Sequence, residues 1–249
     1  MKIVYYSAIP PMSAHKKNVA LVFDVETTGL LRKNHSKLED CPHILQLSYA
    51  MYDCDEKKLI KTVDSYIKIP SNVQIPKEAS DVNHITPAMC AAGLPMLDVL
   101  KEFYDDYHKS TILVAHNYQF DSNMLTVEFE RHWPELIVSH PYALNLFQYT
   151  YIKSQNMQYT CTMAKSTDIC KLAHKTSISS SSSTVKKEGM KEKERPVTYK
   201  WPTLSELNRF LFPTEPQPTN LHNSLVDVLV TLRCYIKMEY NYQIVKLFV

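Results

Sequence analysis

Glycine is scarce in this sequence, which holds Gly29, Gly93 and Gly189 in a length of 249 residues. Because a glycine-rich phosphate-binding loop needs several glycines close together, the sequence excludes such a loop. Cysteine never occurs as a CxxC pair, which argues against a zinc site and favours free thiols in a reducing compartment. The six cysteines are scattered along the chain: Cys41, Cys54, Cys90, Cys161, Cys170 and Cys234.

Long apolar runs and a strong net charge are absent as well. No apolar stretch approaches the roughly 20 residues that a membrane-spanning helix needs. The first residues, MKIVYYSAIPPMSAHKKN, make a poor signal peptide because their apolar stretch is broken. We therefore expect an intracellular protein, cytoplasmic or nuclear and not secreted, with no membrane partner. With a net charge of +2 and an isoelectric point near 8.1, any field that attracts nucleic acid must be local.

Composition also suggests how the chain is organised. It is 45% hydrophobic and 22% charged, which is typical of a soluble globular protein. We predict a flexible N-terminal arm over residues 1–18 and a single domain over 19–249. Residues 176–200 are rich in Ser, Lys and Glu and nearly free of apolar side chains, so we predict a mobile insertion there. A nucleic-acid contact by its basic residues is the less favoured alternative.

Hydrophobic periodicity predicts an α/β domain with a mixed sheet. Continuous apolar runs predict buried strands over 19–25 and 111–115, and alternation of apolar residues predicts strands over 43–53 and 59–69. Helical spacing predicts helices over 87–92, 96–107, 121–132, 203–212 and 225–240. Two caps support these limits: Thr86 before Pro87, and Thr203 with Glu206 three residues later. Between 142 and 173 the pattern is weak, and we predict no element.

Asp24 and Glu26 lie in the apolar, β-branched first strand. Residues two apart on a strand point to the same face, so the two carboxylates are side by side. Their repulsion and desolvation require a neutralising partner. Oxygen ligands suit Mg²⁺ or Mn²⁺. Taken alone, this pair is equally compatible with a strand end that meets solvent.

Two further polar clusters fall at the ends of predicted buried elements, AHNYQFDSNML at 115–125 and LHNSLVDVLVTLRC at 221–234. We expect Asp121 at the N-terminus of a helix, where backbone N–H groups stabilise an anion. A simple N-cap role is the alternative. Asp227 is surrounded in sequence by core residues, so it needs a partner or a metal. His222 lies just before the same helix, and a lone histidine there would more often be structural.

Together these residues predict a specific chemistry. Asp24, Glu26, Asp121 and Asp227 supply four carboxylates, and His222 supplies an ionisable imidazole near the last of them. Two-metal phosphoryl transfer uses this equipment: one ion activates a water, the other stabilises the leaving oxygen, and a base accepts the proton of the water.

The motifs FDVETTGL, AHNYQFD and HNSLVD occur in that order and resemble the three motifs of the DEDDh (DnaQ-like) 3′–5′ exonucleases. The resemblance covers roughly 19–130 and 201–240, and it implies an RNase H-like fold with a mixed five-stranded sheet. It further implies that Asp24, Glu26, Asp121 and Asp227 hold two Mg²⁺ or Mn²⁺ ions and that His222 is the general base. The implied reaction releases 5′-mononucleotides from 3′ ends.

The same resemblance implies substrate contacts. Thr27 and Leu30 would line the terminal nucleotide, and Asn117 and Phe120 would border the same cleft. Phe120 could stack on a base, but core packing is an equal alternative. Relatives often have a His-Gly-Ile-Thr-like segment where this chain has NHIT at 83–86, so the glycine is missing there.

The leading hypothesis is an exonuclease that acts on the 3′ ends of DNA, either single-stranded or frayed. An RNA-trimming 3′–5′ exoribonuclease is the alternative, because the ligand set does not distinguish the sugars. A catalytically silent nuclease fold that binds nucleic acid is the alternative of a different class, and the retained His222 argues against it. A DNA polymerase or repair protein would be a partner in trans.

Overall fold

The computed structural model describes residues 17–32, 37–174 and 198–244. The predicted arm at 1–18 and the predicted insertion at 176–200 lie almost entirely outside these ranges. Both stay predictions, as does the single domain over 19–249.

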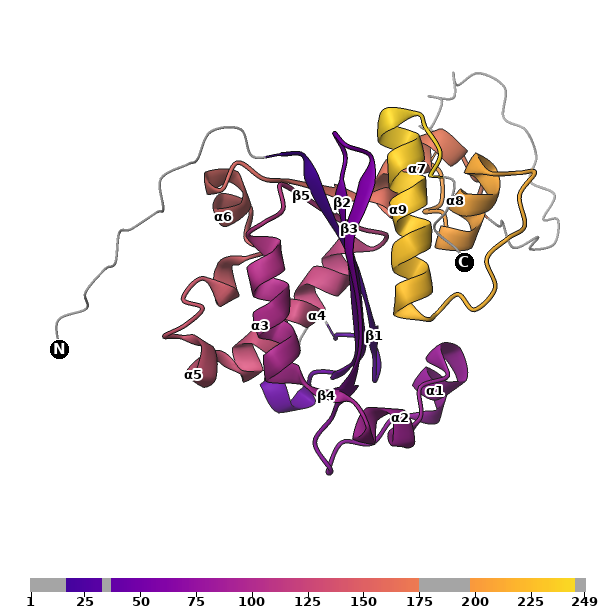
Figure 1. Cartoon of the computed structure of the whole chain (residues 1–249). Helices are drawn as coiled ribbons and strands as arrows, with labels where there is room; N and C mark the ends of the chain where they lie inside the picture. Colours follow the sequence, from indigo (N-terminus) through magenta and orange to yellow (C-terminus); the bar gives the residue numbers. More distant parts are fainter. Residues whose placement is uncertain (1–16, 33–36, 175–197, 245–249) are drawn as a thin grey trace, which may run out of the picture.

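Six strands form one mixed sheet in the order β4-β3-β2-β1-β5-β6 (Figure 1). The strands are β1 Val19–Thr27, β2 Ile44–Asp53, β3 Lys58–Lys68, β4 Leu94–Pro95, β5 Ile112–Ala115 and β6 Gln158–Cys161. The first three strands are antiparallel neighbours, whereas β5 runs parallel to β1 and β6 runs parallel to β5. The predicted α/β fold with a mixed sheet is confirmed.

The strand count is six and not the expected five, because β4 pairs with the end of β3. This strand has two residues, too few for any periodicity to reveal. Gly93, just before it, makes the pairing possible: a Cβ atom on this residue would lie 2.5 Å from the carbonyl oxygen of Tyr66. The missing side chain of Gly93 therefore lets the backbone before β4 lie close to the backbone of β3.

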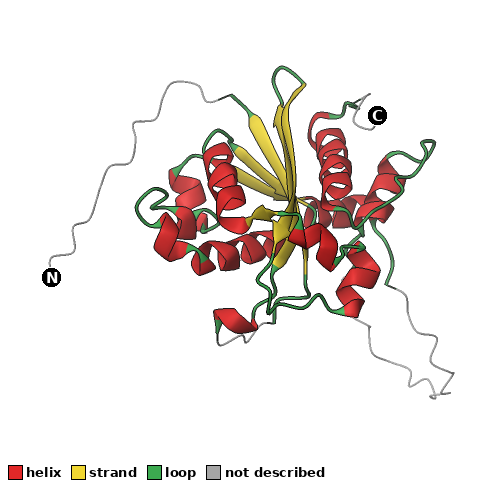
Figure 2. Ribbon diagram, turned by 60° about the horizontal axis from the view of Figure 1, so that its bottom comes forward, coloured by secondary structure: helices red, strands yellow, loops and turns green. Residues whose placement is uncertain are grey.

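Helices cover both faces of the sheet (Figures 1 and 2). On one face lie α3 Met96–Tyr107 and α4 Tyr118–Arg131; on the other lies α9 Ser224–Tyr240, packed against α7 Thr162–Cys170 and α8 Leu204–Leu211. The remaining elements are short: η1 Leu38–Asp40, α1 Lys77–Asn83, α2 Pro87–Ala91, α5 Trp133–Leu136, η2 Ala143–Asn145 and α6 Tyr149–Ser154. No helix in the described part of the chain is long and apolar enough to cross a membrane.

The alternation along β1 sets the position of its two acidic residues. Leu21, Phe23 and Val25 belong to the core under α3 and α4. Ala20 and Val22 belong to the core under α9. Because side chains alternate between faces, Asp24 and Glu26 continue the series that faces α9.

Most predicted helices are confirmed, with one shift. The helix predicted over 96–107 is α3, and Thr203 and Glu206 form the predicted capping box at the start of α8. The helix predicted over 121–132 begins three residues earlier: Asn117 occupies the N-cap of α4, and Asp121 is its fourth residue, within the first turn as expected. The N-cap alternative for Asp121 is excluded for the same reason.

Among the elements between 142 and 173, α7 was missed because its inward-facing residues are mostly polar. In α7 the buried positions are Thr162, Ser166 and Cys170, spaced four residues apart. A search for apolar periodicity does not detect such a stripe. The missed helix α1 buries Asn83 and no apolar side chain.

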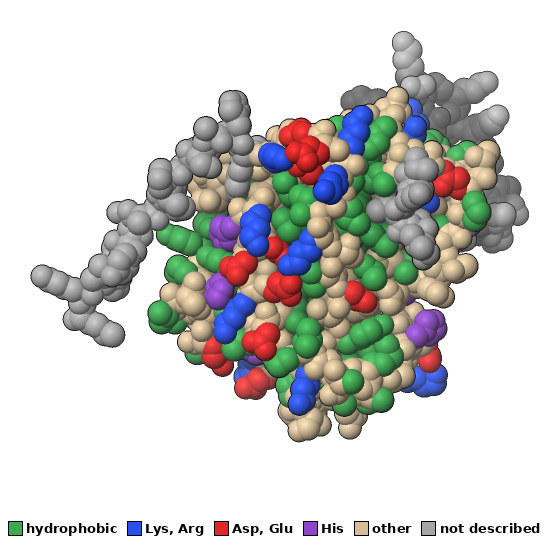
Figure 3. Space-filling view, in the orientation of Figure 1, with side chains coloured by type: hydrophobic (Ala, Val, Ile, Leu, Met, Phe, Trp, Pro, Cys, Tyr) green, Lys and Arg blue, Asp and Glu red, His purple; other side chains and the backbone are tan. Residues whose placement is uncertain are grey.

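The visible surface has no continuous basic area among the described residues. In Figure 3, acidic and basic side chains are interspersed over this face, with hydrophobic side chains between them. This agrees with the small net charge, and it leaves the surface shown without a large field for nucleic acid.

Candidate active site

The structure brings Asp24, Glu26, Asp121 and Asp227 together near the end of β1. β5 is shorter than β1, so α4 begins beside the last residues of β1, and the backbone N–H of Val25 donates to Oδ1 of Asp121 (3.2 Å). From the other face, α9 packs on β1 and β2 and contributes Asp227 as its fourth residue. The candidate ligand atoms of Glu26, His222 and Asp227 all lie within 4.8 Å of one another.

Burial raises the pKa of every carboxyl group in this cluster, and the charges of neighbouring carboxylates add to the effect for Asp24, Glu26 and Asp121. Burial, followed by the charges of Asp227 and Asp121, raises the pKa of Glu26 to about 8. Burial is also the main cause for Asp121 and Asp227, whose pKa values rise to about 8 and about 7. The pKa of Asp24 is raised well above its ordinary value by burial and by the three other carboxylates.

The donor set fits a divalent cation. Asp227 accepts a hydrogen bond at Oδ2 from the backbone N–H of His222 (3.1 Å), but its buried Oδ1 has no hydrogen-bond partner among the described residues. An unpaired buried carboxylate oxygen is costly. Carboxylate oxygens are the ligands that Mg²⁺ and Mn²⁺ prefer, so a cation would relieve both the orphaned oxygen and the repulsion.

Backbone interactions hold His222 at the solvent-exposed side of this cluster. Its φ of 70° lies in the left-handed region, which is uncommon for residues other than glycine. The bond from its N–H to Asp227 accompanies this conformation, and the next residue, Asn223, caps α9 by accepting from the N–H of Val226 (3.3 Å). The His222 side chain is exposed, so its imidazole is accessible to solvent while it lies beside the carboxylates.

The loop after β1 holds the two substrate candidates in different ways. Thr27 is buried, and its hydroxyl donates to the carbonyl oxygen of Gly29 (2.7 Å). Leu30 is 81% exposed. Thr27 therefore shapes the turn, and Leu30 is the residue of the pair with a free apolar surface. Their contacts with a nucleotide stay predictions.

Asn117 and Phe120 lie at the start of α4. Asn117 is exposed and makes no side-chain cap bond. Phe120 is half-buried and packs against the core under α3 and α4, as one of the two alternatives expected. The exposed part of its ring leaves the stacking role as a prediction.

Asn83 is a site residue that lies outside the three sequence motifs. Its side chain hydrogen-bonds Glu26, which lowers the pKa of that residue against the larger effect of burial. Its Nδ2 also lies 3.4 Å from the carbonyl oxygen of Thr27. The following residue, His84, adopts φ 59° and ψ 16°, so the left-handed backbone is present without the glycine of relatives. The NHIT segment was the signal that could have identified Asn83.

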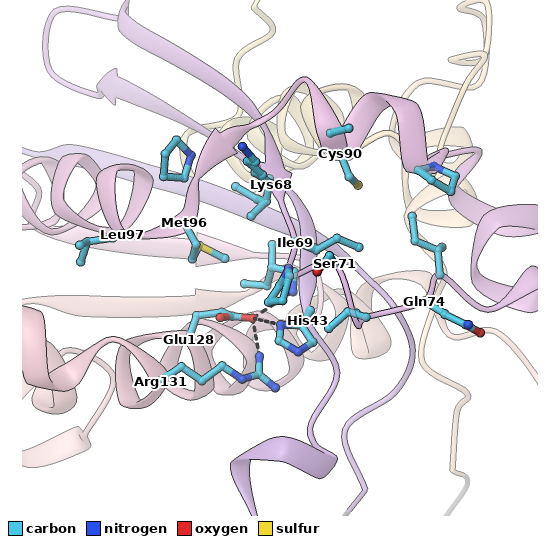
Figure 4. A pocket seen from close by; sticks show the side chains of 18 of the residues that line it. His43, Lys68, Ile69, Ser71, Gln74, Cys90, Met96, Leu97, Glu128 and Arg131 are labelled. Carbon is cyan, nitrogen blue, oxygen red and sulfur yellow. Dashed lines mark hydrogen bonds and ion pairs between the residues drawn. The ribbon is translucent and has the colours of Figure 1, made fainter.

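A cavity lies elsewhere, and the candidate residues do not line it. It has a volume of about 1170 Å³ and is bounded by the loop after β3 and by parts of α2, α3 and α4 (Figure 4). Within it, Glu128 accepts from Arg131 Nη1 (2.6 Å) and from the N–H of Ile44 (3.1 Å), and it faces His43. Glu128 therefore has a cationic partner, Arg131, within this cavity.

The comparison with family sequences identifies the chain. The sequence model of the RNase T family, described as exonuclease, matches residues 21–180, which is more than half of the 249 residues. The chain belongs to this exonuclease family. The matched range contains Asp24, Glu26 and Asp121 and ends before His222 and Asp227.

Relatives with a curated description include the PolC-type DNA polymerase III of Streptococcus pyogenes serotype M5 (strain Manfredo) and that of serotype M1. Each is 30% identical over 112 residues, which is 45% of this chain. The match spans 7% of the PolC chain, so this chain corresponds to a small part of that polymerase.

Solved structures with the same fold include nucleases. The zinc-bound E. coli ExoI–ssDNA complex aligns with a TM-score of 0.58 and 17% identity, over 90% of this chain and 41% of ExoI. The nuclease domain of 3′hExo, a DEDDh family member bound to rAMP, aligns with a TM-score of 0.55 and 11% identity, over 92% and 95% of the two chains. At these identities the likeness concerns the fold, and it confirms the RNase H-like architecture.

Proposed function

We propose that this exonuclease-family chain is a metal-dependent 3′–5′ exonuclease that cleaves DNA from single-stranded or frayed 3′ ends and releases 5′-mononucleotides. The observation that carries the proposal is the convergence of four carboxylates from β1, α4 and α9, two of them buried and two partly buried, with the exposed imidazole of His222. A DNA polymerase or repair protein acting in trans is the partner that would fit such an activity.

The residues have separable roles in this proposal. Asp24, Glu26, Asp121 and Asp227 would hold two Mg²⁺ or Mn²⁺ ions, which when bound supply activation of a water and stabilisation of the leaving oxygen. His222 accepts the proton from the attacking water at a ring nitrogen. The water oxygen forms a bond to phosphorus, and the bond from phosphorus to the 3′ oxygen of the preceding nucleotide breaks. Thr27, Leu30, Asn117 and Phe120 border the terminal nucleotide.

The similar proteins point to different sugars. The PolC likeness and the ssDNA complex of ExoI favour DNA as the substrate. The likeness to 3′hExo bound to rAMP keeps an exoribonuclease as the second candidate. Because discrimination depends on contacts with the 2′-hydroxyl, direct competition between the two substrates decides between them.

The test is digestion of 5′-labelled single-stranded oligonucleotides, as DNA and as RNA, with Mg²⁺, Mn²⁺ or EDTA. A ladder that shortens from the 3′ end, with metal and not with EDTA, supports the proposal, and the faster substrate identifies the sugar. Asp227→Asn is the control for a contaminating nuclease. Binding of the oligonucleotide without digestion under any metal condition would instead indicate a silent binding module.

A further inference from the structure

A row of polar side chains crosses the sheet beside the candidate carboxylates. Asp24 in β1 is opposite Ser48 in β2, which is opposite Asp64 in β3. One pair further along, Glu26 is opposite Gln46. Directly opposed residues point to the same face of a sheet. Ser48, Asp64 and Gln46 therefore share the face that α9 covers.

These side chains form a hydrogen-bonded network with the first residue of α9. Gln46 Nε2 and Ser48 Oγ each donate to Oδ1 of Asp64 at 2.8 Å. The backbone N–H of Ser224 donates to Oε1 of Gln46 (3.3 Å), and the hydroxyl oxygens of Ser48 and Ser224 lie 2.5 Å apart. Gln46, Ser48 and Ser224 are fully buried, whereas Asp64 is exposed.

Asp64 sets the direction of every bond in this network. A carboxylate only accepts, so both of its neighbours must donate. Ser48 has one hydroxyl proton and uses it on Asp64; the hydroxyl of Ser224 must therefore donate to Ser48. Gln46 turns its NH₂ group toward Asp64, which leaves its oxygen to accept from the N–H of Ser224. One exposed carboxylate thus orders three buried groups.

The network ends on the segment that carries two of the candidate catalytic residues. Ser224 follows His222 and Asn223 and lies three residues before Asp227. Asn223 adds a contact of its own, because its Nδ2 lies 3.4 Å from the hydroxyl of Tyr66 in β3. The position of this helix start relative to β1 therefore depends on polar bonds to β2 and β3.

We propose that Gln46, Ser48 and Asp64 are positioning residues, which fix the start of α9 so that His222 and Asp227 meet the carboxylates of β1. The proposal rests on the proposed nuclease function and deepens it. None of the three touches the reacting atoms in this scheme. They act through Ser224, as outer partners of metal ligands do when they orient those ligands.

Asp64→Asn is the decisive substitution because it keeps the size and removes the acceptor-only character. Its NH₂ group can donate to Gln46, which frees the Gln46 amide to turn its own NH₂ toward the N–H of Ser224. We expect kcat to fall about 10-fold and the dissociation constant for Mn²⁺ to rise about 10-fold. The KM for the oligonucleotide should stay unchanged. Asp64→Glu, which restores a carboxylate, should recover most of the loss.

The control is Asp55→Asn, an exposed aspartate that binds Asn18 at the turn between β2 and β3. It should change neither kcat nor Mn²⁺ binding. Mn²⁺ binding is measured by electron paramagnetic resonance, thermal unfolding reports the fold, and Ser48→Ala tests the same network if Asp64→Asn does not fold.

The outcomes separate this proposal from the nuclease function. If Asp64→Asn lowers the melting temperature but leaves kcat and Mn²⁺ affinity unchanged, the network is merely structural and the proposal is wrong. If the wild type digests no nucleic acid and Asp64→Asn still weakens Mn²⁺ binding, the nuclease function fails while the positioning role is supported.

Discussion

Two acidic sites in this protein, Asp106 on α3 and the carboxylate cluster at β1, differ in their surroundings. Asp106 on α3 is 2% exposed and accepts hydrogen bonds from Tyr49 Oη (2.8 Å), Lys61 Nζ (2.5 Å) and Lys109 Nζ (2.8 Å). Burial alone would raise the pKa of Asp106. The bonds from Lys109, Lys61 and Tyr49 outweigh that effect, and its pKa lies below the ordinary value.

Asp121 is buried to the same extent, at 2% exposed, with the opposite result. Its bond from the N–H of Val25 does not offset burial, and the nearby charge is that of Asp227, so its pKa rises to about 8. The charge of Asp106 is neutralised within the fold by Lys61 and Lys109. In the cluster at β1 burial is not offset in this way, and a divalent cation would supply the compensation. Substitutions in each group test this difference.

Asp24→Asn should have the largest effect. Loss of one carboxylate from the cluster should lower the exonuclease rate by about 10³-fold or more, comparable to the loss of a central electrostatic group. The same change removes an acid whose burial opposes folding, so the melting temperature in EDTA should rise. Initial rates on a labelled oligonucleotide and thermal unfolding in EDTA measure the two effects. A lower melting temperature in EDTA would show that the burial of this acid does not limit the stability of the metal-free protein.

His222→Asn should reduce kcat by roughly 10²–10⁴-fold if the imidazole accepts the proton of the water. The carboxylates are left intact, so Mn²⁺ binding should change by only a few-fold. Single-turnover rates and Mn²⁺ titration separate these quantities. His174→Asn, at another exposed histidine, is the matched control. A rate close to that of the wild type would remove His222 from the mechanism.

Divalent metal should stabilise the protein more at alkaline than at acidic pH. The raised pKa values of Glu26, Asp121 and Asp227, about 8, 8 and 7, mean that the native metal-free state holds more protons than the unfolded chain above about pH 4. Its free energy of unfolding therefore falls as pH rises from about 4 to 8.

Binding of Mn²⁺ removes this penalty and should add about 2.7 kcal/mol at a concentration 100 times the dissociation constant. The measurement is the shift in melting temperature on adding Mn²⁺ at pH 5.5 and at pH 8. An equal shift at the two pH values would contradict the raised pKa values.

The sequence predicted the parts of this difference that depend on local spacing. Asp24 and Glu26 were predicted to share a face because side chains alternate along a strand. Asp227 was identified as a candidate because it is an acid among the apolar residues of a predicted helix. Their convergence with Asp121 depends on how far β1 extends beyond β5, which no local pattern records. The resemblance to the DEDDh exonucleases supplied that information.

Other features could not be predicted from the sequence for a different reason. The polar stripe Thr162, Ser166 and Cys170 hides α7 from any search for apolar periodicity. The link from Ser48 to Ser224 joins residues 176 positions apart, and a serine pair carries no sequence signal. Hydrogen-bonded contacts of this kind depend on the register of three strands and can be identified only once the fold is known.

Asp106→Asn should have the smallest effect on chemistry and a moderate effect on stability. The amide loses the charge that attracts Lys61 and Lys109, and it weakens a buried set of charge-assisted bonds, so the free energy of unfolding should fall by about 2 kcal/mol. Both lysines reach solvent and can rehydrate, which limits the loss. The exonuclease rate per folded molecule should be unchanged, because this acid lies in the core under α3 and has its own cations. Denaturant unfolding and initial rates, measured on the same preparation with and without Mn²⁺, give both values. Metal-dependent stability in the variant should match that of the wild type; a change in it would mean that the two groups of carboxylates are coupled through the sheet.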